Sequence, residues 1–429
     1  MPARLLPLLL LFVVATALSA REFVSRDGKK TLEADFISLD EQAQTVKLRL
    51  PSGKFVDAEL AYFKDEDQAY FEKMLEKYGA YLSVPPAYRR RFVSEERLAN
   101  WNKPRVGARA DEATLEGLRW LKQRQDPDGS WNEGSQTVAM TAMALMSYLG
   151  NGKTPLSEEF GESAMKAMIF LIANAEKNKG RLARSTEDKH WCYEHAVATY
   201  ALAEAYAICN GLRIHIPNLK ETVQRAGQLI IDNQHRTSGG WCYDYDRDGA
   251  RGGDLSISGW QIQALSACRD TKLEFEGLNE ALEKAADYVE QRANPSGGFG
   301  YSGKQGLGNF GYDTLTGVGV HTLYLMGRGD GREAKRGLAY IGRKSKFEYD
   351  TEWCDLYALY YEALAVRKSA KGRLWAEGRI SQLLDHQKDD GSWPAPGGAG
   401  RPNAIAASFT SNSIYRQCLC LLVLESPYR

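Results

Sequence analysis

A glutamate and a histidine stand side by side where one of the apolar segments of the chain begins. The stretch Tyr193-Glu194-His195 opens this segment, and Thr199 follows His195 at the four-residue spacing of one helix face. A carboxyl group and an imidazole at the opening of an apolar cavity can act as general acid and base. The same residues also fit a polar cluster that only caps and orients the turn, since a charged group inside an apolar ring needs a partner. Glu194 and His195 are therefore candidate catalytic residues.

Asp254 is a third acidic candidate, and it precedes another apolar segment. Its position before Leu255 and Ser256 is typical of a helix N-cap, where a carboxylate accepts hydrogen bonds from backbone amides. Asp313 stands in the same way before Thr314. We treat Asp254 as a candidate catalytic residue and Asp313 as a candidate ligand-binding residue, with capping as the alternative for both.

Aromatic residues near these positions could surround a central cavity and hold a ligand through their rings. The candidates are Trp191, Tyr193, Trp241, Tyr243, Trp260, Tyr312 and Trp353, with Tyr357 and Tyr360 further along the chain. Thr199 and His321 complete the predicted binding set, although a histidine in the middle of an apolar segment also fits a core position. Packing within the turns explains some of the aromatic residues equally well.

The sequence predicts no metal site and no cofactor. His190, Cys192 and His195 are residue types that zinc accepts, but a zinc site needs three or four ligands in a defined geometry, and no fourth is evident. The glycine-rich segment 306–311 lacks the Lys-Ser/Thr ending of a phosphate loop. The Gly-x-Ser-x-Gly motif of a nucleophilic serine does not occur.

The candidate residues lie at or beside turns that recur along the chain. Asp128-Gly-Ser-Trp131 and Asp390-Gly-Ser-Trp393 are nearly identical, and the aromatic residues of six such turns follow one another at spacings of 44 to 60 residues. Those six positions are Trp131, Trp191, Trp241, Phe299, Tyr349 and Trp393. Such self-similarity indicates repeats of one structural unit.

Two kinds of helical segment alternate around these turns. The first kind is amphipathic, with apolar residues at three- and four-residue spacing. These segments are 111–125, 161–176, 219–234, 278–292, 332–343 and 372–387. The second kind is apolar nearly all round, which is typical of a buried helix. These segments are 136–149, 193–209, 256–268, 314–326, 351–367 and 409–424. The alternation predicts a mainly α fold, an α6/α6 toroid of six helix-hairpin repeats in which an outer ring encloses an inner one.

The segments 118–131 and 383–393, which both end in Asp-Gly-Ser-Trp, resemble the Gln–Trp repeats of squalene and hopene cyclases, the terpenoid cyclases. The same repeat occurs in protein prenyltransferase β subunits. The resemblance covers residues 108–429, and it implies the same toroid with a central cavity for a hydrophobic ligand.

The residues that carry either chemistry in these families are not evident here. Cyclases have an Asp-x-Asp-Asp motif whose central aspartate is the acid, and the best match is Arg251-Gly-Gly-Asp254, with Gly253 in the place of the acid. Prenyltransferases hold zinc with Asp, Cys and His, and Phe310-Gly-Tyr-Asp313 lacks the expected His. The resemblance therefore implies a ligand-binding toroid without an evident cyclase acid or zinc site.

Residues 21–75 predict a small β domain, because short stretches alternate between apolar and polar residues with the period of a strand. Three stretches resemble Sla homology domain 1, an SH3-like barrel. They are Arg21-Glu-Phe-Val-Ser-Arg-Asp-Gly28, Glu33-Ala-Asp-Phe36 and Asp67-Gln-Ala-Tyr70. In its eukaryotic founder that domain binds a short peptide motif, so the resemblance implies a possible peptide or protein partner, with a purely structural accessory domain as the alternative.

Residues 76–107 are expected to form a linker, because Pro85-Pro86 and Lys103-Pro104-Arg105 interrupt any long packed element. The basic run Arg89-Arg-Arg91 within it is expected to be solvated.

Residues 1–20 read as a signal peptide: Arg4 precedes an apolar run, and Ala17-Leu-Ser-Ala20 offers small residues for cleavage. A protein exported to the periplasm or secreted is the expectation, with an N-terminal anchor as the alternative.

The chain has seven Cys, of which Cys192 and Cys242 could form a bridge. Lys+Arg and Asp+Glu both number 55, and this balance argues against a dedicated nucleic-acid partner. No later stretch predicts stable membrane insertion.

Three functions fit these patterns. The first is a toroid that binds a hydrophobic isoprenoid or lipid ligand. The second is a protein-interaction scaffold that uses the N-terminal barrel domain. The third is a glycan-active enzyme, since toroids of helix pairs also host such activities, and it needs two suitably spaced carboxylates.

Overall fold

The computed structural model describes residues 21–50, 54–132, 136–302, 312–351, 353–396 and 412–429. The predicted signal peptide 1–20 lies outside the described residues, and so do the side chains of Tyr312 and Asp313. The chain divides into two compact units, Met1–Ala87 and Tyr88–Arg429.

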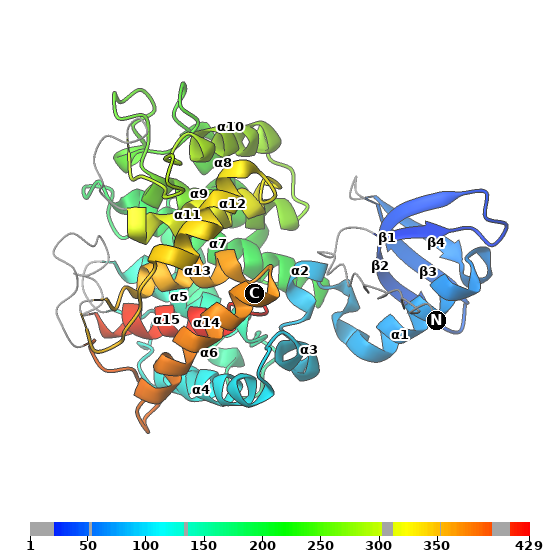
Figure 1. Ribbon diagram of the computed structural model, residues 1–429. Helices are drawn as coiled ribbons and strands as arrows, with labels where there is room; N and C mark the ends of the chain where they lie inside the picture. Colours follow the sequence, from blue (N-terminus) through cyan, green and yellow to red (C-terminus); the bar gives the residue numbers. More distant parts are fainter. Residues whose placement is uncertain (1–20, 51–53, 133–135, 303–311, 352, 397–411) are drawn as a thin grey trace, which may run out of the picture. The chain divides into compact units, whose positions relative to one another are not determined.

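The first unit is built on a four-stranded antiparallel sheet (Figure 1) in the order β1-β2-β3-β4. The strands are Arg21–Val24, Thr31–Asp40, Thr45–Arg49 and Phe55–Glu59, and helix α1, Asp65–Tyr78, follows them. The small N-terminal β unit is thus confirmed as an antiparallel sheet. Its kinship with Sla homology domain 1 stays a prediction.

The core of this unit is aromatic. The rings of Phe23, Phe36 and Phe63 lie 4.8 to 5.2 Å from the ring of Phe71, which α1 contributes. The carboxylate of Asp67 accepts hydrogen bonds from the Arg21 guanidinium at 2.8 Å and from the Val24 amide at 2.9 Å. These bonds fasten the first turn of α1 to the edge strand β1.

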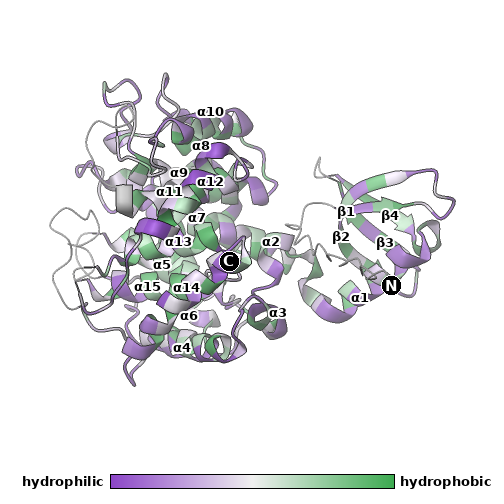
Figure 2. Cartoon of the chain, viewed as in Figure 1, coloured by the Kyte–Doolittle hydropathy of each residue, from purple (hydrophilic) through white to green (hydrophobic). Residues whose placement is uncertain are grey.

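The second unit contains the predicted alternation of half-exposed and buried helices. The outer helices are α4 (Pro104–Gln123), α6 (Gly161–Lys177), α8 (Leu219–Asp232), α10 (Leu278–Glu290), α12 (Arg332–Lys344) and α14 (Ala370–His386). The inner helices are α5 (Thr137–Gly150), α7 (Trp191–Gly211), α9 (Leu255–Asp270), α11 (Tyr312–Leu325), α13 (Leu356–Val366) and α15 (Ser413–Glu425). Figure 2 shows the difference in hydropathy between, for example, α5 and α12.

The inner helices pack in chain order, and α15 packs against α5, so the inner ring is closed. Each inner helix also packs against the outer helix that precedes it. The prediction of a toroid of helix hairpins is therefore confirmed.

Three Gln–Trp turns, those after α4, α8 and α14, each fasten one outer helix to the next. In the turn after α8, the amide nitrogen of Gln234 donates to the carbonyls of Gly239 and Ala281, both at 2.8 Å, and Ala281 belongs to α10. The indole of Trp241 donates to the carbonyl of Ile230 at 2.8 Å. Gly239 has φ +80°, and a side chain there would meet the carbonyl of Lys284 at 2.4 Å, so only glycine fits.

All inner helices run in the same direction. The N-terminal ends of neighbouring inner helices lie together. For example, the Thr314 hydroxyl of α11 donates to the carboxylate of Asp355, the residue before α13, at 2.9 Å. Their ends meet as well, since the guanidinium of Arg269 on α9 donates to the carbonyl of Leu325 on α11 at 2.9 Å. We call these two faces the N-terminal end and the C-terminal end of the ring.

Residues 88–103, expected to be part of a linker, are packed into the helical unit and include helix α3 (Ser94–Ala99). Arg89 and Arg91 are buried, which corrects the expectation of a solvated basic run. The reason is an ion pair: both Nη atoms of Arg91 bond the carboxylate of Glu204 on α7, at 2.8 and 3.0 Å. A charged partner inside the ring thus offsets the loss of hydration.

Candidate functional site

Glu194 lies at the N-terminal end of the ring, where it caps another helix. Its Oε2 accepts from the amides of Val138 and Ala139, the first turn of α5, at 3.1 and 3.4 Å. Its Oε1 accepts from the amide of Arg184 at 3.3 Å. Burial raises the pKa of Glu194 to about 7, although these amides act in the opposite direction. The carboxylate is fully engaged by the backbone.

His195 is enclosed in the wall between α7 and α8. Its Nδ1 accepts from the amide of Leu182 at 3.0 Å, and its Nε2 lies 3.1 Å from the carbonyl of Ala226, to which it must donate. These partners fix the neutral tautomer, and burial lowers the pKa to about 4. The hydroxyl of Thr199 donates to the carbonyl of His195 at 2.7 Å. Both side chains are satisfied by the fold.

Asp254 differs from these residues. It is fully buried at the start of α9, yet its side chain makes no capping bond. Neither carboxylate oxygen has a hydrogen bond of good geometry to a described residue, although the hydroxyl of Tyr301 lies close enough to lower the pKa of Asp254. Its nearest cation is Arg251, whose Nε lies 3.5 Å from Oδ1. Burial raises the pKa of Asp254 to about 6, and Arg251 opposes this rise.

Pairs of hydroxyl groups lie around Asp254. The hydroxyls of Tyr243 and Tyr301 are 2.6 Å apart, and those of Tyr193 and Ser256 are 2.7 Å apart. The rings of Tyr193 and Tyr243 lie 5.9 Å apart, which joins the two pairs. The backbone carbonyl of Tyr301 accepts a hydrogen bond at 2.8 Å from the amide of Leu255, the residue after Asp254. This bond holds Tyr301 beside Asp254.

Arg251, Ser256 and Tyr301 were not among the predicted site residues. Tyr301 does end the turn Gly297-Gly-Phe-Gly-Tyr301, which corresponds to the turn that carries Tyr243, and this equivalence between repeats could have identified it.

The other predicted aromatic residues divide between the turns and the ring axis. Trp241 is a turn anchor without exposed surface. Trp260 stacks on Tyr360 at 6.0 Å, and the amide of Gln263 donates to the hydroxyl of Tyr361 at 2.8 Å. Because α9 and α13 are not neighbours in the ring, these contacts cross the centre of the ring.

Among the tyrosines of the inner helices that keep some accessible surface, burial raises the pKa of three most strongly. They are Tyr193 and Tyr200 on α7 and Tyr415 on α15. Tyr360 on α13 lies close enough to raise the pKa of both Tyr200 and Tyr415.

Trp191 closes the outer side of the site. Its indole donates to Asp244 at 2.6 Å. A surface cavity of about 270 Å³ lies beside it, with Arg181, Asn233 and Asp244 among its polar lining residues. Asp244 and Tyr245 both have positive φ, 56° and 53°, so this loop is held in a strained conformation.

The remaining predicted residues lie apart from Asp254 or outside the described part. His321 is buried on α11 with its ring 6.2 Å from that of Tyr361, and burial lowers its pKa strongly. Trp353 is half-buried beneath the ammonium group of Lys346, 4.4 Å from the ring. The side chains of Tyr312 and Asp313 are not described.

All seven cysteines are buried free thiols, so Cys192 and Cys242 form no bridge. Within the described ranges, no group of three or more His, Cys, Asp or Glu side chains could hold a metal ion. In the same ranges, no helix combines the length and hydropathy needed to cross a bilayer.

No protein-family model matches the chain, and neither does any curated protein sequence. Among solved structures, the α-1,6-mannanase GH76A of Salegentibacter is similar with a TM-score of 0.55 and 10% identity, over 74% of this chain and 98% of that one. An inactive variant of that enzyme in complex with α-1,6-mannotriose has a TM-score of 0.54 and 11% identity, over 74% and 99% of the two chains. The type II terpene cyclase MstE of Scytonema, in complex with geranylgeranyl dihydroxybenzoate, has a TM-score of 0.47 and 14% identity, over 76% and 99%. The likeness to the mannanase shows that the helical unit has an α/α-toroid fold.

Proposed function

We propose that the toroid binds an amphipathic isoprenoid or other lipid on the ring axis, and that the ligand enters at the N-terminal end. The observation that carries this proposal is Asp254, a fully buried carboxyl group that caps no helix and has no hydrogen bond of good geometry to the described residues, with the hydroxyl of Tyr301 and the guanidinium of Arg251 nearby. Buried polar groups are nearly always hydrogen-bonded, so a ligand group is the natural partner for this one.

The surroundings fit a ligand with two different ends. Tyr243, Tyr301 and Arg251 offer hydroxyl and guanidinium groups near Asp254, which suit a polar head. Deeper in the ring, the stacked rings of Trp260 and Tyr360 offer apolar faces, which suit a hydrocarbon body. With a pKa of about 6, Asp254 can exist in both protonation states near neutral pH, so it can also donate a proton to a bound ligand.

A glycan is the second candidate ligand. The hydroxyl pairs Tyr243–Tyr301 and Tyr193–Ser256 favour it, because sugars bind through several hydroxyl contacts and aromatic faces. Hydrolysis of a glycan requires a second carboxyl group about 5–9.5 Å from the first. Glu194 and Asp355 are occupied as helix caps, so neither of them is a ready second group.

The test starts with the full chain, purified without detergent and extracted with organic solvent for mass spectrometry. We expect a bound isoprenoid or lipid in near-equal molar amount, and a strongly reduced amount in Asp254→Asn. Asp385→Asn is the matched control, because Asp385 is an exposed residue that pairs with the exposed Arg109.

Thermal unfolding with added probes covers the case of an empty extract. Geranylgeraniol or oleate should raise the unfolding midpoint of the wild type and not that of Asp254→Asn. If α-1,6-mannotriose alone raises it, the glycan proposal replaces ours. If no probe changes the midpoint and the extract is empty, the toroid is not a receptor for small ligands of either class.

A further inference from the structure

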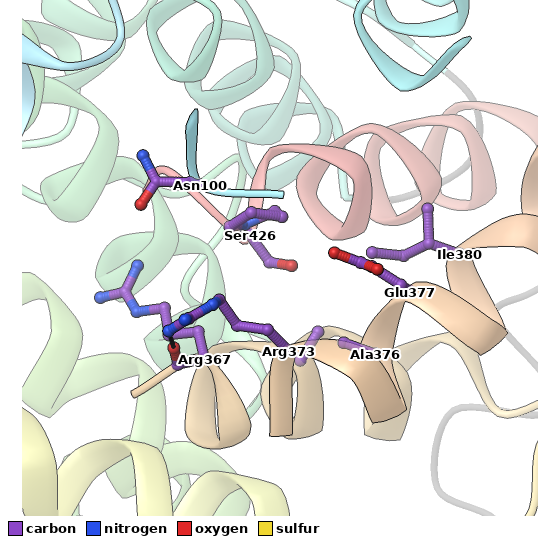
Figure 3. Close-up of a pocket in the computed structure, with 9 residues that line it drawn as sticks. Asn100, Arg367, Arg373, Ala376, Glu377, Ile380 and Ser426 are labelled. Carbon is purple, nitrogen blue, oxygen red and sulfur yellow. Dashed lines mark hydrogen bonds between the residues drawn. The ribbon is translucent and has the colours of Figure 1, made fainter. Parts of the chain in front are cut away.

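The surface cavity beside Trp191, which we call the outer cavity, has a volume of about 270 Å³. Its lining comes from the loops before α7 and α9 and from the last turn of α8, and it includes none of the residues around Asp254. By comparison, the pocket lined by Arg367 and Glu377 (Figure 3) has a free volume of about 10 Å³, which is room for about one water molecule. Of these two pockets, only the outer cavity can hold an organic molecule.

The outer cavity carries one cation and one anion, Arg181 and Asp244. The two side chains are exposed, and neither forms an ion pair with the other or with another described residue. The guanidinium of Arg181 lies 5.6 Å from the centre of the Trp191 ring. Asp244 Oδ1 accepts from the indole of Trp191 at 2.6 Å, while its other oxygen accepts no hydrogen bond from a described residue. Opposite charges that line one cavity without pairing are complementary to a ligand that carries both charges.

The apolar part of the lining is small. It consists of Leu229 and of the rings of Trp191 and Tyr245, whose centres lie 4.9 Å apart in an edge-to-face arrangement. Trp191 and Tyr245 are only 6% and 5% exposed, so each presents a limited part of its ring to the cavity. Asn233 borders this surface, and its side-chain nitrogen donates to the carbonyl of Leu229 at 2.8 Å. An apolar surface of this extent suits a short hydrocarbon group and not a long chain.

The wall that carries Asp244 is strained and firmly held. Asp244 and Tyr245 have φ values of 56° and 53°, which are unfavourable for residues other than glycine. The amide of Asp244 donates to the carbonyl of Lys189 at 3.0 Å, and the hydroxyl of Tyr245 donates to the buried Gln261 at 2.9 Å. Backbone strain of this kind is concentrated at functional sites, where the surrounding structure maintains it. The wall is therefore formed before a ligand arrives, which lowers the entropic cost of binding.

We propose that the outer cavity binds a small zwitterion, an α-amino acid with an apolar side chain. Its carboxylate pairs with the guanidinium of Arg181, its ammonium group pairs with the carboxylate of Asp244, and its side chain lies on Leu229 and the two rings. A neutral sugar offers no charge to either residue, and a lipid tail is too long for the apolar surface. Because Asp254 does not line the outer cavity, the proposal does not depend on which ligand the toroid axis binds.

Calorimetric titration of the full chain at low ionic strength tests the proposal, with L-leucine as the probe. Leucinamide lacks the carboxylate and N-acetyl-leucine lacks the ammonium group, so each loses one of the two charge pairs. We expect both derivatives to bind about fivefold more weakly than leucine, which is the upper range for a solvent-exposed ion pair. Glycine, which has no side chain, should also bind more weakly. No binding of leucine, or equal binding of leucine and the two derivatives, would overturn the proposal.

Two substitutions assign the charges of the ligand to their partners. Arg181→Gln should weaken the binding of leucine and leave that of leucinamide unchanged, since leucinamide has no carboxylate to lose. Asp244→Asn should weaken leucine and leave N-acetyl-leucine unchanged, and its side-chain oxygen can still accept from the Trp191 indole.

Matched controls remove the same charges from exposed ion pairs elsewhere. Arg332→Gln, which loses the pair with Glu333, and Asp385→Asn should both bind leucine like the wild type. Asp254→Asn should do so too, which separates a failure of this proposal from a failure of the lipid site. Wild-type affinity for leucine in Arg181→Gln and Asp244→Asn would show that the ligand does not bind in the outer cavity.

Discussion

At the C-terminal end of the ring, Glu204 lies between Arg91 and Arg429 and accepts hydrogen bonds from both. At the N-terminal end, Asp254 is equally buried but forms one long ion pair, with Arg251 at 3.5 Å, and no hydrogen bond of good geometry to a described residue. The pKa of Glu204 is lowered, since the two guanidinium groups outweigh the effect of burial. The pKa of Asp254 is raised to about 6, since burial outweighs Arg251.

This difference separates a group that holds the fold together from one that is available for a ligand. A fully paired buried charge closes the ring where α7, α15 and residues 88–103 meet. An unpaired one lowers stability unless something binds to it, and perturbed carboxyl groups of this kind concentrate at functional sites.

The largest expected effect is the loss of the paired charge. Glu204→Gln leaves Arg91 and Arg429 buried without their shared counter-charge, and we expect the free energy of unfolding to fall by about 3–5 kcal/mol. Urea denaturation followed by circular dichroism measures this change. Glu162→Gln, which removes an exposed pair with Lys166 on α6, should leave the denaturation midpoint unchanged. Equal midpoints for both variants would mean that the network does not hold the ring.

The opposite sign is expected for Asp254→Asn. The pKa of the carboxyl is about 6 in the folded chain and 3.8 ordinarily, so above pH 6 its ionisation destabilises the folded state. At about 1.4 kcal/mol per pKa unit, the ligand-free variant should be more stable than the wild type by roughly 3 kcal/mol at pH 8.

The pH dependence of this difference is the sharper measurement. As the pH falls from 6 toward 4, the folded chain binds a proton on Asp254 that the unfolded chain, with a pKa of 3.8, does not yet bind. The wild type therefore gains stability, and the advantage of Asp254→Asn should shrink. Urea denaturation of both proteins at pH 5 and pH 8 provides the comparison. If the variant is less stable than the wild type at pH 8, Asp254 has a structural partner and the contrast between the two ends disappears.

The ring could be predicted from the sequence because its causes are local. Apolar periodicity distinguished inner from outer helices, and the recurring Gln, Gly and Trp of the turns set their number. The structure supplies the reason for these residues, for example in the amide of Gln234, which bonds two carbonyls at 2.8 Å. Three residue types at fixed spacing make the same contacts in several repeats, so the sequence pattern is strong.

The site was harder to predict because capping and catalysis use the same residue types. Glu194 and Asp254 both precede or begin an inner helix, yet one caps α5 and the other caps nothing. The difference depends on which backbone amides lie within reach, and that is set by packing between repeats. Arg91 shows the same limitation, since its partner Glu204 is more than a hundred positions away in the sequence.

Within the N-terminal end, Glu194→Gln tests whether a satisfied carboxylate behaves differently from Asp254. The substitution removes one of two acceptor oxygens, so at least one of the amides of Val138 and Arg184 loses its partner. Because the pKa of Glu194 is raised to about 7, its ionisation also costs stability at pH 8, and the lost acceptor offsets about 1–2 kcal/mol of the gain from removing that charge. We therefore expect a smaller gain in the free energy of unfolding than for Asp254→Asn. Urea denaturation detects this difference, and amide hydrogen exchange should show faster exchange in the first turn of α5. An equal gain in stability in both variants would show that the two carboxyl groups are equivalent.

The smallest expected effect separates ligand binding from stability. Tyr243→Phe removes the hydroxyl that lies 2.6 Å from that of Tyr301, and Tyr428→Phe removes one that accepts from the Asn151 amide at 3.2 Å at the C-terminal end. Each substitution should lower the free energy of unfolding by about 0.5–1.5 kcal/mol, because each removes one hydrogen bond. Only Tyr243→Phe should reduce the amount of lipid that co-purifies with the chain, or the shift of the unfolding midpoint by geranylgeraniol. Since the two variants delete the same atom, a loss of ligand in both would indicate a general effect on the fold, and a loss in Tyr428→Phe alone would place the binding site at the C-terminal end.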